Sequence, residues 1–239
     1  MRPLAAILFD IDDTLYSTTD FVEVARAHAL EAMLGAGLKL DRDRLSDELR
    51  EIVVKAGSNY EHHFDELLSR LPAESYDPVN PALIISAGVI AYHDTKMRQL
   101  VPYEDAVELI KSLSQRGSLL LGAVSAGVPV KQAEKILRLG LDKYFAPQGV
   151  FITEQMGLSK ADGELWQRVC AALEVEPGAT MYVGDNPPND VDGPNSVGML
   201  TTLVRRGGKY KDVTPRTQPD FTIEDFWDLR DILEREFGI

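Results

Sequence analysis

The stretch "ILFDIDDTL", residues 7 to 15, runs from apolar residues directly into three aspartates. It completes the apolar run 4–9, and a short continuous run of this kind is typical of a strand that is buried on both faces of a parallel sheet. The aspartates Asp10, Asp12 and Asp13 repel one another, and an unpaired buried carboxylate costs free energy. The stretch therefore predicts a strand that ends at a spot where a divalent cation offsets the carboxylates.

Further apolar runs alternate with amphipathic helical patterns along the rest of the chain. The runs cover residues 118–127, 149–153, 180–185 and 198–204. The helical patterns between and around them cover residues 103–116, 129–139, 161–173 and 189–196. This alternation predicts an α/β fold with a doubly wound parallel sheet. We expect a polar loop over residues 205–220 and a final helix over 223–236.

A long segment after the first strand interrupts this alternation. Residues 16–98 contain helical periodicity and no strong strand pattern, with helices expected at 19–36, 42–55, 60–70 and 81–98. A helical insert of this length favours a second domain. We therefore expect a core domain formed by residues 1–15 and 99–239, and a helical domain formed by residues 16–98.

Composition and charge exclude several classes of protein. The chain has 239 residues and a net charge of −13, which argues against a nucleic-acid partner because phosphate backbones need clustered cations. The single cysteine, Cys170, allows no intramolecular disulfide and fits a reducing cytoplasm. We see no signal peptide and no apolar stretch of membrane-spanning length. We expect a cytoplasmic monomer or homodimer.

The polar candidates follow predicted strands. Asp10, Ser125 and Asp185 each lie at or just past a strand's carboxyl end, so they converge on one edge of the sheet, where ligands of such sheets bind. Asp10 and Asp12 lie two apart, on one side of an extended segment, and can act as nucleophile and general acid/base. Asp185 and Asp190 can supply carboxylate oxygens to a hard cation. Capped turns or solvated loops remain the alternative for each aspartate.

Two further segments suit a phosphate group. Ser125 and Ala126 lie between a strand and a helix opened by Pro129, and a hydroxyl with backbone amides at a helix N-terminus can hold phosphate. The alternative for the serine is a simple helix cap. Lys160 precedes another helix, where it is either placed near an anion or solvated at the surface.

The combination of these signals resembles the haloacid dehalogenase superfamily over nearly the whole chain. In chain order the motifs are DxDDTL, a strand-end serine, a lysine before a helix, and GDxxxxD. They correspond to Asp10 and Asp12, Ser125, Lys160, and Asp185 and Asp190. The resemblance implies a Rossmann-like core with a helical cap inserted after the first motif. The acid at position 12 is similar to the superfamily's phosphatases rather than to its dehalogenases.

Stretches of the cap and the core are also similar to archaeal members described as glyceraldehyde 3-phosphate phosphatases. Among them are "GSNYEHHFDELLSRL" and "PVKQAEKILRLGLDKYF". The resemblance implies that Asp10 forms an aspartyl phosphate, that Asp12 is the acid and base, and that Ser125 and Lys160 hold the phosphoryl group. It also implies Mg²⁺ held by the Asp10 carboxylate, the Asp12 backbone carbonyl and Asp185, with Asp190 in the second shell or acting through water.

The cap is expected to choose among small phosphorylated metabolites. Asn59, His63 and His93 are the candidates for reading the substrate, although a histidine on a helix is more often simply packed. Two rivals to a phosphatase stay open. One is a phosphomutase of the same superfamily, and the other is a module that binds a phosphate ligand without turnover.

Overall fold

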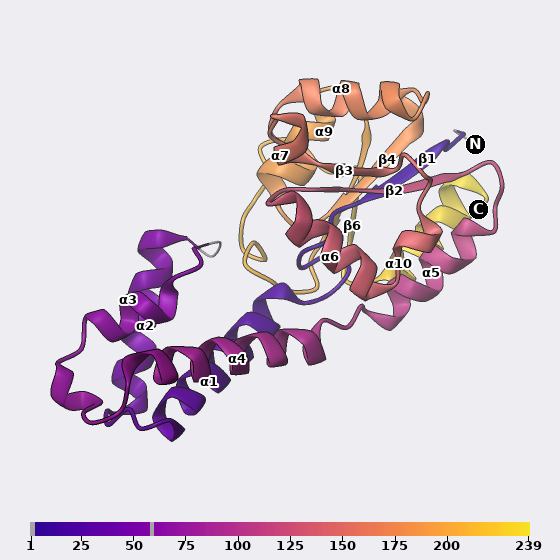
Figure 1. Cartoon of the computed structure of the whole chain (residues 1–239). Helices are drawn as coiled ribbons and strands as arrows, with labels where there is room; N and C mark the ends of the chain where they lie inside the picture. The colour runs from indigo at the N-terminus through magenta and orange to yellow at the C-terminus, as the bar shows by residue number, and fades with distance from the viewer. Residues whose placement is uncertain (1–2, 58–59) are drawn as a thin grey trace. The chain divides into compact units, whose positions relative to one another are not determined.

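The computed structural model describes residues 3–57 and 60–239. The chain divides into two compact units (Figure 1). The first contains the chain up to Thr19 and from Leu100 onward, and the second is Asp20–Gln99. Residues 16 to 19 group with the first unit because Tyr16 and Thr18 bond to Asp12, and Thr19 bonds to Asp13.

The first unit is built on a sheet of six parallel strands in the order β3-β2-β1-β4-β5-β6. The strands are β1 (Ala6–Phe9), β2 (Leu120–Ser125), β3 (Val150–Ile152), β4 (Thr180–Gly184), β5 (Leu200–Val204) and β6 (Phe221–Ile223). The order reverses beside β1, which lies between β2 and β4. The predicted α/β class with a doubly wound parallel sheet is confirmed.

Helices cover both faces of this sheet (Figure 1). They are α5 (Glu104–Ser114), α6 (Pro129–Leu139), α7 (Thr153–Met156), α8 (Gly163–Ala172), α9 (Gly193–Asn195) and α10 (Phe226–Ile232), which continues as a π-helical turn over Leu233–Phe237. Successive side chains of β1 point to opposite faces of the sheet. Leu8 belongs to the core cluster with Trp166 of α8, whereas the ring of Phe9 lies 6.1 Å from that of Phe226 in α10. Burial on both faces explains the continuous apolar run.

The edge strand β6 was missed by the sequence prediction. Residues 221–223 were expected at the junction of a polar loop and a helix, but they pair in parallel with β5, Thr202 opposite Phe221. Asp220 supports the pairing, since its carboxylate accepts a hydrogen bond from the backbone N–H of Thr201 at 2.9 Å. A strand of three residues is too short to show an alternating apolar pattern in the sequence. Its formation also depends on the free edge of β5, with which it pairs.

The second unit is helical and has its own core. Its helices are α1 (Thr18–Gly35), which begins in the first unit, α2 (Arg42–Ala56), α3 (His63–Ser69) and α4 (Pro81–Gln99). Asp41 caps α2 by accepting hydrogen bonds from two backbone N–H groups of its first turn. Gly88 lets α4 approach α1, since an added Cβ would lie 2.9 Å from Met33. The core side chains include Ala29, Leu30, Met33, Leu45, Leu49, Ile52, Phe64, Leu67 and Ile84.

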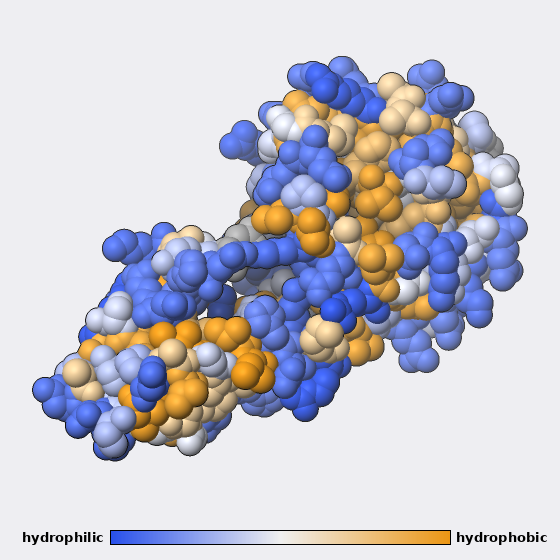
Figure 2. All heavy atoms as spheres, in the orientation of Figure 1, coloured by the Kyte–Doolittle hydropathy of each residue, from blue (hydrophilic) through white to orange (hydrophobic). Residues whose placement is uncertain are grey.

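Helix α4 is apolar on its outer side as well. Leu83, Ile90 and Met97 are more than half exposed and recur every seven residues, and Figure 2 shows apolar side chains over this helix. A helix with apolar residues on several sides carries only a weak amphipathic pattern. Even so, none of the helices within residues 3–57 and 60–239 is both long and apolar enough to cross a membrane.

Candidate active site

Three neighbouring strands of the sheet unit deliver the polar side chains. Asp10 follows β1, Ser125 ends β2 and Asp185 follows β4, and β1 pairs with both of the other strands. The carboxyl ends of parallel strands meet at one edge of a sheet, beside the point where the strand order reverses. The chain therefore gathers residues that are far apart in sequence at the expected ligand-binding edge.

A cluster of buried carboxylates lies at this edge. Asp10, Asp185 and Asp190 each place a carboxylate oxygen within 4.8 Å of the others. Their residues are only 6%, 4% and 0% exposed. Burial raises the pKa of Asp185, and the charges of Asp10 and Asp190 raise it further. Burial likewise raises the pKa of Asp10, despite the opposing effect of Lys160. Simultaneous ionisation of the three buried carboxylates is therefore unfavourable unless cations lie close to them.

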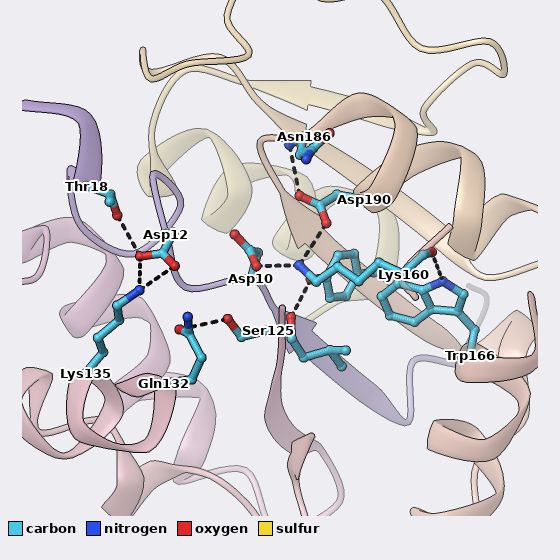
Figure 3. Close-up of polar contacts among 12 residues, drawn as sticks. Asp10, Asp12, Thr18, Ser125, Gln132, Lys135, Lys160, Trp166, Asn186 and Asp190 are labelled. Atoms are coloured by element: carbon cyan, nitrogen blue, oxygen red, sulfur yellow. Dashed lines mark hydrogen bonds and ion pairs between the residues drawn. The ribbon is translucent and has the colours of Figure 1, made fainter. Parts of the chain in front are cut away.

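Lys160 supplies one of these cations. Its Nζ donates to Asp10 and, at 3.0 Å, to Asp190, and only 4% of the residue is exposed (Figure 3). Burial alone would lower the pKa of Lys160, but the two carboxylates raise it above its ordinary value. Trp166 fixes the backbone here, since its Nε1 donates to the Lys160 carbonyl at 2.8 Å. The alternative of a solvated surface lysine is therefore wrong.

The donor set fits a divalent metal ion. Three carboxylates against one ammonium leave two negative charges uncompensated when all are ionised. Among the described residues, the buried Oδ2 of Asp185 has no hydrogen-bond partner. An orphaned carboxylate oxygen in an acidic cluster is what a hard cation with oxygen ligands requires.

Asp12 is engaged elsewhere. Its carboxylate accepts hydrogen bonds from Lys135 at 2.7 and 2.6 Å and from the Thr18 hydroxyl at 2.7 Å (Figure 3). It also accepts one from the Tyr16 hydroxyl at 2.5 Å. Burial would raise the pKa of Asp12, but Lys135 above all, with Tyr16 and Thr18, lowers it below its usual value. The Asp12 side chain is thus a separate, ionised group beside the carboxylate cluster.

The third aspartate of the stretch caps a helix. Asp13 has a positive φ of 56° and accepts hydrogen bonds from the backbone N–H groups of Thr18 and Thr19 and from the Thr19 hydroxyl. These donors belong to the first turn of α1, whose N–H groups have no partner within the helix. The local sequence therefore turns the chain sharply after β1 and starts α1 at Thr18.

Ser125 is buried and held by α6. Its Oγ donates to Gln132 Oε1 at 3.1 Å. Ala126 follows it and is exposed, and Gly127 then takes a φ of 129° before α6 begins. A Cβ at this glycine would lie 2.7 Å from Gln132 Nε2, so a larger residue at position 127 would clash with the glutamine side chain. The strand–turn–helix junction predicted for these residues is present.

Gln132 and Lys135 were not predicted as site residues. They lie three positions apart on α6, so they share one face of that helix, and they bond to Ser125 and Asp12 respectively. That spacing on the helix after Ser125 was the available signal. Tyr16 and Thr18 were also missed, although they lie only four and six positions from Asp12.

The cap candidates belong to the helical unit. His63 starts α3, and its Nε2 lies 2.9 Å from the carbonyl oxygen of Gly57. Burial lowers the pKa of His63, which disfavours the charged form of the ring. His93 is exposed on α4 with its ring edge-on to Tyr92. Asn59 lies outside the described residues.

Comparison with known proteins identifies the family. A model of haloacid dehalogenase-like hydrolases matches residues 4–198. The chain belongs to the haloacid dehalogenase-like hydrolase family. The resemblance noted in the sequence is therefore confirmed.

Relatives of this hydrolase match along nearly their whole length. A protein of Methanopyrus kandleri, named glyceraldehyde 3-phosphate phosphatase, is 42% identical over 235 residues, which cover 96% of this chain and 97% of its own. A protein of the same name from Methanocaldococcus jannaschii is 36% identical, with 97% of both chains covered. The solved structure of a HAD phosphatase from Thermococcus onnurineus superposes with a TM-score of 0.66 at 22% identity, covering 96% and 98% of the chains, and shares the fold.

Gly184→Ala is expected to disturb the hydrolase site sterically. An added Cβ would lie 2.7 Å from Asp190 Cβ, so Asp190 would have to move away from Lys160. Overpacking of this kind costs about 1–3 kcal/mol, and misplacing a site group lowers activity by ~10-fold or more. Urea unfolding and hydrolase activity measure the two effects. Gly117→Ala, where an added Cβ meets no atom within 4 Å, is the control and is expected to change neither. Wild-type activity in the Gly184 variant would contradict the prediction.

Proposed function

We propose that this family member is a Mg²⁺-dependent phosphatase of small phosphorylated metabolites, with glyceraldehyde 3-phosphate as the first substrate to test. The observation that carries the proposal is the buried cluster of Asp10, Asp185 and Asp190 around Lys160 at the carboxyl edge of the sheet. Full-length relatives named glyceraldehyde 3-phosphate phosphatase, 42% and 36% identical, support the substrate.

Asp10 is the proposed nucleophile. An oxygen of its carboxylate bonds to phosphorus while the bond from phosphorus to the ester oxygen breaks, leaving an aspartyl phosphate. Lys160 stabilises the ionised Asp10, and within the part of the chain that the structure describes it uses two of the three donors of its ammonium group on carboxylates, so the third is proposed to bind a phosphoryl oxygen. Ser125 Oγ and the backbone amide of Ala126 are proposed to hold the other phosphoryl oxygens.

Asp12 is the proposed acid and base. The charge of an arriving phosphate ester raises the pKa of Asp12 and favours its protonated form. Asp12 then gives its proton to the departing alkoxide oxygen, and the alcohol leaves. In the second step Asp12 takes a proton from water as the water oxygen bonds to phosphorus. The bond between Asp10 and phosphorus breaks, and inorganic phosphate is released.

Mg²⁺ fits the cluster as the proposed cofactor. The Asp10 and Asp185 carboxylates and the Asp12 backbone carbonyl are proposed to hold it, with Asp190 bonded to Lys160 and to the Asn186 backbone N–H nearby. When bound, the ion supplies positive charge that offsets the carboxylates and the phosphoryl oxygens.

The helical unit is the proposed selector of substrate. Residues 20–99 form a separate helical core inserted between β1 and β2. The insert begins shortly after the nucleophile strand, and just beyond its other end the Tyr103 backbone N–H donates to the carbonyl oxygen of Leu15 at 2.9 Å. Inserted lids of this kind exclude water and admit substrates that fit. His63 and His93 remain proposed contacts to the substrate, and a small metabolite suits a lid better than a macromolecule does.

Phosphate release with and without metal tests this function. We expect the dialysed chain with Mg²⁺ to release phosphate from glyceraldehyde 3-phosphate and from p-nitrophenyl phosphate. Excess EDTA is expected to lower both rates by at least ~100-fold, because the carboxylate cluster then lacks its compensating charge, and added Mg²⁺ should restore them. Binding of phosphate without turnover would support a binding module instead. Undiminished hydrolysis in EDTA would overturn the metal assignment.

A further inference from the structure

Lys135 is a long-range partner of the Asp12 side chain. Its Nζ donates to Oδ1 at 2.7 Å and to Oδ2 at 2.6 Å, across 123 positions of sequence, and it comes from α6 (Figure 3). The side chains of Lys135 and Asp12 are 13% and 31% exposed, so the pair is shielded from bulk solvent. An ion pair in this setting is screened less than one at the surface.

The two donors close to Asp12 in sequence meet the same oxygen of its carboxylate. Tyr16 and Thr18 both donate to Oδ1, whereas Lys135 donates to Oδ1 and to Oδ2. The torsion that turns an aspartate carboxylate about its Cβ–Cγ bond is broad and has no sharp preferred value. External donors to both oxygens are therefore needed to fix the plane of the carboxylate.

Helix α6 makes this support rigid. Gln132, three positions before Lys135, bonds to Ser125 at the end of β2, and Ile136 and Leu139 are buried on the same helix. Lys135 thus reaches Asp12 from an element that is itself fixed to the sheet. A loop aspartate that must meet a reacting oxygen gains from such an anchor, because small displacements of a catalytic group cost large factors in rate.

We propose that Lys135 is a positioning residue that fixes the Asp12 carboxylate for proton transfer to the leaving group. The proposal rests on the phosphatase function proposed above. Lys135 acts through Asp12 and is assigned no contact with the phosphoryl group. Removal of the Lys135 ammonium group should therefore slow the hydrolysis of esters whose leaving group needs a proton. It should have little effect on the hydrolysis of esters whose leaving group departs without one.

Two substrates separate these cases. Glyceraldehyde 3-phosphate must release an alkoxide, which needs a proton, whereas p-nitrophenyl phosphate releases a stabilised phenolate. The value of kcat/KM covers events up to the departure of the leaving group, so the later hydrolysis of the aspartyl phosphate does not mask the difference. For Lys135→Met, which keeps most of the aliphatic chain, we expect kcat/KM to fall ~10–100-fold on the triose phosphate and by less than about 3-fold on the aryl phosphate.

Three further variants and one binding measurement sharpen the test. Arg138→Met removes a cation from the same helix, one that pairs with Glu134 at 2.8 Å. This variant should leave kcat/KM unchanged for both substrates. Lys135→Arg keeps a cation that can contact both oxygens and should recover part of the loss. Lys135→Gln, which keeps a donor without the charge, covers the case in which the methionine variant fails to fold. Inhibition by inorganic phosphate should be unchanged in each Lys135 variant, because the phosphate-binding groups are intact.

The outcomes distinguish this proposal from the phosphatase function. A wild-type chain that hydrolyses neither ester would overturn both. A wild-type phosphatase whose Lys135 variants lose the same factor on both esters, or lose nothing, or gain on the triose phosphate, would overturn the positioning role alone. Weaker inhibition by phosphate in these variants would instead place Lys135 on the phosphoryl group.

Discussion

Asp10→Asn is expected to abolish turnover, with a loss of about 10⁴-fold or more, while the chain keeps its fold. The amide has nearly the shape of the carboxylate but cannot attack phosphorus as an anion. Its oxygen can still accept a hydrogen bond from Lys160, and Lys160 keeps its second partner, Asp190, at 3.0 Å. Phosphate release measures the loss, and circular dichroism with thermal unfolding measures the fold.

Asp13→Asn is the matched control for this substitution. It makes the same chemical change three positions away, at a residue that caps α1 through hydrogen bonds from Thr18 and Thr19. Asparagine can also cap a helix and tolerates a positive φ, so we expect rates within ~10-fold of wild type. If Asp10→Asn kept wild-type turnover, the nucleophile would have to be another group, and Ser125 would be the next residue to test.

Lys160→Met is expected to lower both activity and stability. It removes the ammonium partner of Asp10 and Asp190 from a buried cluster that also contains Asp185. Removing one member of a buried ion pair costs about 3–5 kcal/mol, because the remaining charge has no compensation. Activity is expected to fall ~10³-fold or more, as the nucleophile and the phosphoryl group lose the same cation. Urea unfolding and phosphate release are the measurements.

Two measurements test whether uncompensated negative charge explains the effect of Lys160→Met: the addition of Mg²⁺ and the substitution of a second lysine. Because the effect arises from uncompensated negative charge, added Mg²⁺ should return part of the lost stability to Lys160→Met. Lys143→Met is the control, since Lys143 also lies over a tyrosine ring, 5.0 Å from the centre of Tyr144, but is exposed. The corresponding distance for Lys160 over Tyr182 is 5.2 Å. Equal losses in both variants would show that the ring contact, rather than the carboxylates, explains the effect.

The fold class followed from features that are local in sequence. The apolar run 4–9 forms β1 and is buried throughout its strand residues, and the alternating helices and strands produce the doubly wound sheet. The family also followed from local motifs, because DxD, the strand-end serine, the lysine and GDxxxxD each lie within a few residues of a strand or helix end. Asp10, Ser125 and Asp185 could be placed together because parallel strands end at one edge.

Tertiary structure alone decided which charged groups pair. Sequence spacing placed the Asp10 and Asp12 carboxylates on one side of the chain, but packing joins Asp10 to Lys160 and joins Asp12 to Lys135, 150 and 123 positions away. It also created β6, whose three residues form a strand because β5 offers an edge. Ion pairs and edge pairing depend on distances through space between segments remote in sequence, and a local pattern contains no record of those distances.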